Sequence, residues 1–195
     1  MLHLAAKFNY KLESIPDMFP FTEVFDIIMM KGKTKEKKLK ESFISSLNGI
    51  KSTSVHKRII DICNKKSADI MTTNFDLSLE STYNYKEKSD IPLKKGFTHR
   101  YPWQRNYSSN ENDISSIKIW HIQGDAHYKM SVRLTVKDYI YSYNHFHKYD
   151  PLNKKSQFGK SYTWVEPFFE KKLVIVGIGM EEQELFLRQL LYKKK

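Results

Sequence analysis

The sequence predicts an α/β fold, in which a mostly parallel sheet carries helices on both faces. Three apolar runs lead into polar or glycine-containing turns, in the blocks 71–76, 119–125 and 173–180. Stretches with helical periodicity separate and surround them. The third run is apolar throughout, as in a strand that is buried on both faces of a parallel sheet. Turns at the carboxyl ends of such strands are where open α/β sheets bind ligands.

The first third of the chain, residues 1–66, is predicted to be mostly helical. A helix begins after Thr34 and ends at the Asn48-Gly49 pair, a common stop signal. Its apolar face consists of Leu39, Phe43, Ile44 and Leu47. A second helix is expected to place four residues on one side: Val55, Ile59, Ile62 and Cys63. Cys63 is interpreted as a small hydrophobe in the packing of that side.

Residues 67–192 are predicted to form the α/β core. A strand over 68–72 leads through a polar loop into a helix that contains Leu77 and Leu79. The segment 81–116 is polar, so we interpret it as a long loop or insertion that covers the sheet edge. Two further strands are expected over 117–122 and 132–136.

The remainder of this core alternates helices with one more strand. A tyrosine-rich helix over 138–147 is followed by a polar connection over 148–161 and a short helix over 164–170. The apolar run 173–178 is the predicted last strand. A final amphipathic helix carries Leu185, Leu187, Leu190 and Leu191. The whole chain, 1–195, is interpreted as a single domain.

Composition excludes several classes of protein. No apolar stretch approaches the roughly 18 residues of a membrane span, and the N-terminus lacks the apolar run of a secretory signal. The single cysteine, Cys63, excludes an intramolecular disulfide and a four-cysteine zinc site. We therefore expect a cytoplasmic protein with no membrane association and no metal site.

The net charge of +11 raises the question of nucleic-acid binding. Much of the charge is lysine, in a run over 31–40 and at the C-terminus, whereas arginine reads phosphates and bases better. A solvated basic surface is the simpler interpretation. A nucleic-acid partner, a protein partner and a homo-oligomer all stay open.

Asn74 and Asp76 lie two residues apart just beyond the first predicted strand. An amide and a carboxylate on one side of a loop suit a ribose, because they accept and donate hydrogen bonds to hydroxyl groups. The alternative is that Thr72, Thr73, Asn74 and Asp76 cap the next helix, as such residues commonly do. The sequence pattern alone leaves both interpretations open.

Three motifs in a fixed order resemble the sirtuin-like (silent information regulator 2) family. Thr73-Asn74-Phe75-Asp76 resembles its Gln-Asn-Ile-Asp block, and the Thr-Thr-Asn-Tyr-Asp of bacterial members even more closely. Trp120 to Asp125 resembles its Trp-His-Ile-His-Gly-Asp block, and residues 163–191 resemble its closing strand and helix. The resemblance implies a Rossmann-like fold and NAD as ligand or substrate.

The same resemblance assigns roles to individual residues. It implies Asn74 and Asp76 as catalytic groups, together with position 123. Further NAD contacts are implied at Thr72, Thr73, Gly124, Gly177 and Gly179. In bacterial antiphage defence, relatives hydrolyse NAD to ADP-ribose and nicotinamide.

Two departures from the family pattern weaken the catalytic prediction. Gln123 stands where the family has its histidine base, and a glutamine takes up no proton near neutral pH. His121 could substitute, but a histidine fixed by a backbone hydrogen bond is the expected alternative. We therefore expect catalysis to be impaired, or the scaffold to serve as a non-enzymatic regulatory or binding module through its basic surface.

The second departure concerns the front of the fold. The family begins with a strand and a glycine-rich turn for the pyrophosphate, whereas the first glycine of this chain is Gly32. We expect the first strand and its turn to be missing, and DNA upstream of Met1 to encode them in frame. The lack of a zinc ribbon argues against protein deacylation and for NAD-related binding or cleavage.

Overall fold

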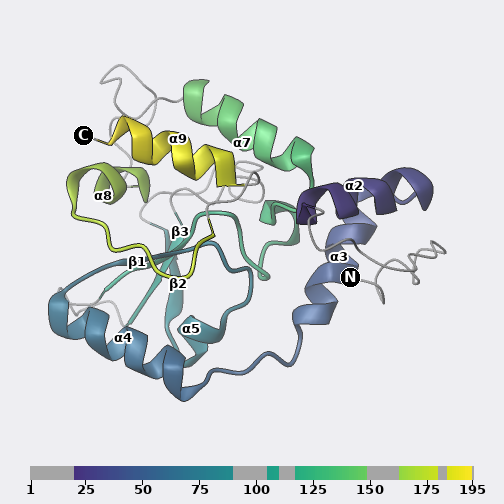
Figure 1. Ribbon diagram of the computed structural model, residues 1–195. Helices are drawn as coiled ribbons and strands as arrows, with labels where there is room; N and C mark the ends of the chain where they lie inside the picture. The colour runs from purple at the N-terminus through teal and green to yellow at the C-terminus, as the bar shows by residue number, and fades with distance from the viewer. Residues whose placement is uncertain (1–19, 90–104, 110–116, 149–162, 180–183, 195) are drawn as a thin grey trace. The chain divides into compact units, whose positions relative to one another are not determined.

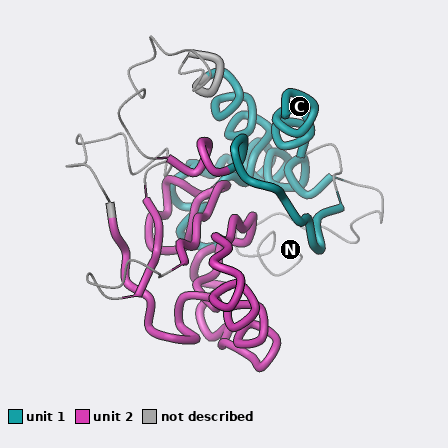
Figure 2. The backbone as a smooth tube through the Cα atoms, turned by 90° about the vertical axis from the view of Figure 1, so that its left-hand side faces the viewer, with its two compact units in different colours: residues 1–43, 133–159, 168–195 teal, residues 44–132, 160–167 magenta. Residues whose placement is uncertain are grey.

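The computed structural model describes residues 20–89, 105–109, 117–148, 163–179 and 184–194 (Figure 1). The chain divides into two compact units, which Figure 2 colours separately. Unit 1 comprises residues 1–43, 133–159 and 168–195, and unit 2 comprises residues 44–132 and 160–167. No helix within the described ranges is both long and apolar enough to cross a membrane.

Unit 2 contains a mixed four-stranded sheet with the strand order β1-β4-β3-β2. Its elements are α4 (Ser54–Lys66), β1 (Ile70–Thr72), α5 (Ser78–Ser81), β2 (Lys86–Ser89), β3 (Arg105–Ser108), β4 (Ile119–His121) and the short 3-10 helix η1 (Lys129–Ser131). The prediction of an α/β fold is confirmed. A mostly parallel sheet is not: β1 pairs with β4 in parallel, whereas β3 pairs antiparallel with both β4 and β2.

The parallel pair consists of the two strands that the apolar runs predicted. Ile70 lies opposite Ile119, and Thr72 lies opposite His121 at the carboxyl ends. Because the two strands end at the same level, the polar turns that follow them meet at one edge of the sheet.

The segment 81–116 is not simply a loop, because it contributes β2 and β3. These strands form an antiparallel pair in which Lys86 lies opposite Ser108 and Ser89 opposite Arg105. Their sequences, Lys-Glu-Lys-Ser and Arg-Asn-Tyr-Ser, lack the apolar alternation that predicts a strand. All four β3 residues are nevertheless buried, and β3 is an inner strand of the sheet, paired on both edges.

Helix α4 packs on this sheet through a different face from the predicted one. Ile60 is fully buried in a cluster with Tyr85, Tyr107, Ile117 and Ile119, and Cys63 packs against that cluster. Val55, Ile59 and Ile62 are exposed, with Val55 62% accessible. The prediction for Cys63 is therefore confirmed, whereas that for the other three residues of this face is wrong.

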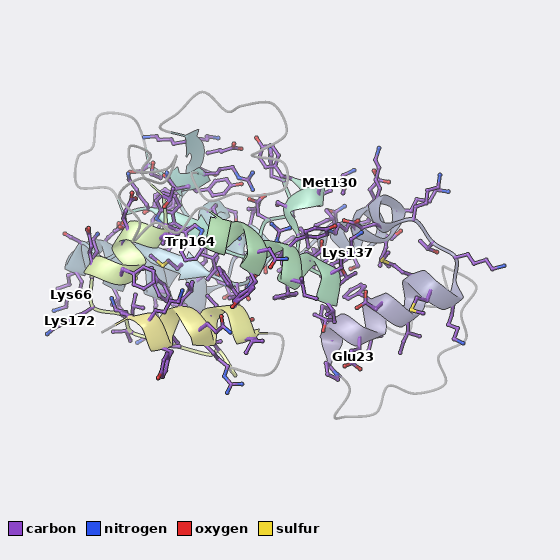
Figure 3. The ribbon with its side chains drawn as sticks, turned by 90° about the horizontal axis from the view of Figure 1, so that it is seen from above. Glu23, Lys66, Met130, Lys137, Trp164 and Lys172 are labelled. Atoms are coloured by element: carbon purple, nitrogen blue, oxygen red, sulfur yellow. The ribbon has the colours of Figure 1, made fainter. Side chains whose placement is uncertain are left out.

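Unit 1 is built mainly from helices. Its elements are α2 (Phe21–Lys31), α7 (Val136–Lys148) and α9 (Leu185–Lys193), while α3 (Glu36–Leu47) and α8 (Val165–Glu170) each cross the boundary between the units. Phe25 stacks edge-on against Phe21 and Phe43, which joins α2 to α3. Lys194 donates to the carbonyl oxygens of Phe168 and Phe169 and thereby caps the end of α8. Trp164, labelled in Figure 3, precedes α8 and is fully buried.

Residues 132–136 do not form the predicted strand. The backbone N–H groups of Leu134 and Thr135 both donate to the Asp138 carboxylate, so they are committed to the start of α7. Lys40 Nζ lies 2.8 Å from Asp138 Oδ1. The positive charge of Lys40 and these hydrogen bonds lower the pKa of Asp138 despite its burial, which acts in the opposite direction.

The run 173–178 is also not a strand in the structure. Val174 is 89% exposed and Val176 is 79% exposed, so the segment is neither buried nor part of the described sheet. A strand requires a neighbour to supply the other half of its hydrogen bonds. Within the described residues no such neighbour pairs with this segment.

Candidate functional site

The turns that follow β1 and β4 are bonded to each other through the backbone. Ile122 N donates to Thr72 O at 3.0 Å, and Ala126 N donates to Phe75 O at 2.7 Å. The two predicted motifs of unit 2, residues 72–76 and 121–125, thus lie side by side at the carboxyl ends of the parallel pair, with 121–125 buried and 72–76 more exposed. This is where the sequence places a ligand site.

In the first turn, local hydrogen bonds to the backbone account for two of the predicted site residues. Thr72 Oγ1 accepts from Asn74 N at 3.1 Å, and Asp76 Oδ1 accepts from Ser78 N at the start of α5 at 3.0 Å. Asn74 differs, because it is exposed and its side-chain amide makes no hydrogen bond to the described part of the chain. Asn74 is therefore the polar group of this turn that is accessible to a ligand, with the half-buried Thr73 beside it.

In the second turn, Gln123 is buried, with 2% of its surface exposed. Gly124 follows at φ +92°, a conformation that side chains rarely adopt. A Cβ atom there would lie 2.1 Å from Ser131 O, so the turn packs directly on the backbone of η1. Close packing within the chain thus requires glycine at this position, whether or not a ligand also approaches it.

A buried ion pair supports the second turn from β3. Arg105 and Asp125 are fully buried and joined by a hydrogen bond, and the Arg105 guanidinium lies 3.8 Å over the centre of the Tyr128 ring. Asp125 Oδ1 also accepts from His127 N and Tyr128 N, at 2.9 and 3.2 Å. The sequence signalled Asp125 through its motif, but it offered no signal for Arg105, which lies in the segment interpreted as a loop.

Replacing Arg105 with methionine is expected to lower the free energy of unfolding by about 3 kcal/mol, because the Asp125 charge would stay buried without its counterion. Urea unfolding monitored by circular dichroism measures this loss. The matched control is Lys57→Met in the exposed Lys57–Asp61 pair, whose atoms lie 3.7 Å apart. The control is expected to leave the unfolding midpoint unchanged. Equal effects of the two substitutions would contradict this account of the Arg105 pair.

His121 is the residue that could have replaced the missing base. It is 2% exposed, and its two ring nitrogens lie 2.7 Å from Asn74 O and 2.7 Å from Glu80 Oε1. The expected backbone hydrogen bond is confirmed. Because both nitrogens are occupied inside the protein, His121 does not face a ligand as a base would have to.

Gly177 and Gly179 belong to unit 1. Gly177 has φ +69°, and a Cβ atom there would meet nothing within 4 Å. The positive φ angle, and not close packing, therefore favours glycine at position 177. The remaining predicted site residues all belong to unit 2.

A metal ion finds no preformed site in the described ranges, since no group of three histidine, cysteine, aspartate or glutamate side chains converges there. The thiol of Cys63, which packs against the core of unit 2, has a raised pKa because of its burial. A raised pKa disfavours the thiolate that binds metals or acts as a nucleophile.

Comparison with known proteins identifies a family for this chain. The family model described as "SIR2-like domain" matches residues 68–193, which include both turns of the site and the closing helix α9. No curated protein and no solved structure matches the chain.

Proposed function

The chain belongs to the SIR2-like domain family, and on this basis we propose that it binds NAD at the joined turns of β1 and β4 but cleaves it poorly. The observation that supports the proposal most is the exposed amide of Asn74. It stands at the carboxyl end of the parallel pair, on a turn fixed by the Ala126–Phe75 backbone hydrogen bond.

The proposed chemistry assigns a role to each group of the site. Cleavage of the nicotinamide–ribose bond develops positive charge on the sugar, which a nearby carboxylate stabilises. In this proposal Asn74 holds a ribose hydroxyl or the attacking water. Asp76 supplies the negative charge through Oδ2, since Oδ1 accepts from Ser78 N. Thr72, Thr73 and Gly124 would lie nearest the ligand in unit 2.

Gln123 limits this chemistry to binding or very slow hydrolysis. A base must take a proton from water or from a ribose hydroxyl, and an amide does not do so near neutral pH. Family members hydrolyse NAD in antiphage defence. In this proposal the present protein, located in the cytoplasm, keeps the binding of NAD but has lost most of its hydrolysis.

Calorimetry with NAD tests the binding. The unmodified protein is expected to bind NAD. Asn74→Ala is expected to weaken the affinity about tenfold, because the variant loses the free energy of one hydrogen bond to a polar group of the ligand. Asn48→Ala removes an exposed amide at the end of α3 and serves as the matched control. Absence of NAD binding, or equal losses in both variants, would contradict the proposed site.

A further inference from the structure

His121 occupies an unusual position between three segments of unit 2. It lies at the end of β4, and its ring nitrogens reach the carbonyl oxygen of Asn74 on one side and the carboxylate of Glu80 in α5 on the other. Both contacts are 2.7 Å long, and Glu80 is 3% exposed. The proposed reaction uses neither side chain.

The chemistry of the two partners determines where protons must be. The Asn74 carbonyl oxygen only accepts, so His121 Nδ1 must carry a hydrogen. At Nε2, a hydrogen bond to Glu80 needs one more proton, on the nitrogen or on the carboxyl oxygen. The two contacts therefore exist together only while the His121–Glu80 pair holds this extra proton.

We propose that His121 and Glu80 form a proton-dependent clamp that positions the loop carrying Asn74. When the extra proton leaves, a neutral imidazole has a single N–H to share between two acceptors. One of its nitrogens then faces an oxygen with no hydrogen between them, and these atoms repel each other. The clamp opens either at Asn74 or at Glu80. The consequence for a ligand rests on the proposed NAD site, whereas the clamp itself does not.

The surrounding charges favour the protonated state. Burial lowers the pKa of His121, but the hydrogen bond and the charge of Glu80, followed by the charge of Asp125, outweigh it and raise the pKa above its usual value. Arg105 of β3 pairs with Asp125 and offsets part of that charge. Tyr107 of β3 meets the His121 ring edge-on at 5.7 Å and stays neutral, because burial raises its pKa far above the usual range.

The direction of the pH dependence follows from this shift. A histidine whose pKa is raised in the folded protein stabilises the fold fully at a pH below its ordinary pKa of 6.5. This stabilisation is lost as the pH rises through the pKa of the folded protein. The clamp is therefore closed in mildly acidic solution and opens at alkaline pH.

Nuclear magnetic resonance of the full chain labelled with nitrogen-15 tests the clamp without any ligand. In the unmodified protein, both ring nitrogens of His121 are expected to be protonated at pH 6. The amide signals of Asn74 and Phe75 are expected to shift with the same midpoint as the ring, above pH 6.5. His127→Gln removes a nearby exposed histidine and is expected to leave this titration unchanged.

Glu80→Gln provides the decisive variant. A neutral His121 would then donate through Nδ1 to Asn74 and accept at Nε2 from the new amide, so both contacts persist without the extra proton. The Asn74 and Phe75 signals are expected to stay constant from pH 6 to pH 9 in this variant. Loop signals of the unmodified protein that stay constant from pH 6 to pH 9, or that titrate equally in Glu80→Gln and the unmodified protein, would overturn the proposal.

NAD binding by calorimetry at pH 6.5 and pH 9 forms a separate arm of the experiment. The affinity of the unmodified protein is expected to fall between these pH values, and that of Glu80→Gln to stay level. If neither protein binds NAD but the loop signals behave as stated, the proposed function fails and the clamp stands. If both proteins bind NAD and the loop signals do not follow His121, the clamp fails and the proposed function stands.

Discussion

Replacing Gln123 with histidine is expected to raise the rate of nicotinamide release from NAD by about 100- to 10,000-fold, the usual contribution of a general base. Position 123 follows β4 and precedes Gly124; its side chain is buried beneath the turns that we propose for the ribose, so the gain requires the new imidazole to reach the ligand. Histidine takes up a proton near neutral pH and glutamine does not. Release followed by chromatography in the two proteins measures the difference.

A second substitution makes this result specific. Asn74→Ala in the Gln123→His background is expected to abolish the gained activity, whereas Asn48→Ala in the same background is expected to retain it. Rapid release by the unmodified protein, lost on Asn74→Ala, would show that catalysis is not impaired. A Gln123→His protein that is folded and binds NAD but gains no activity would show that more than the base is missing.

Replacing Gly124 with alanine is expected to lower the free energy of unfolding by about 4 kcal/mol, which combines backbone strain with overpacking. The new Cβ atom would lie 2.1 Å from Ser131 O, and the obstructing atom is backbone, which has no rotamer to change. The turn would have to separate from η1. Urea unfolding monitored by tryptophan fluorescence measures the loss, since Trp120 is fully buried in the adjoining strand.

Gly49→Ala separates the two contributions. Gly49 has φ +102°, close to the +92° of Gly124, but a Cβ atom there would meet nothing within 4 Å. Its substitution is expected to cost only the strain, about 1 to 2 kcal/mol. Similar losses at the two positions would mean that the contact with Ser131 is not what requires a glycine in the second motif.

The strands β1 and β4 could be predicted because each is a short apolar run that ends at a polar motif. Their pairing with each other could not be predicted, because an apolar run does not record which strand lies beside it. By contrast, β2 and β3 consist mainly of polar residues, and only their pairing within the sheet makes them strands. Arg105 could not be predicted as the partner of Asp125, since no local pattern records a contact between distant strands.

The buried face of α4 shows a different limit. Ile59 and Ile60 are adjacent, so helical spacing supports two overlapping stripes, one through Val55, Ile59 and Ile62 and another through Ile60 and Cys63. The choice between them depends on where Tyr85, Tyr107 and Ile119 lie, and these residues come from other elements. Periodicity predicted the helix correctly, but it could not decide which stripe faces the sheet.

The exposed run 173–178 has a consequence for the behaviour of the protein in concentrated solution. Leu173, Val174, Ile175 and Val176 are consecutive, uncharged, mostly β-branched and free of proline, which is the composition of segments that stack into cross-β fibrils. Two exposed lysines, Lys171 and Lys172, come immediately before them. Charged residues in such flanking positions act as gatekeepers that oppose stacking by like-charge repulsion. High salt screens this repulsion, so a low-salt buffer suits storage of the protein.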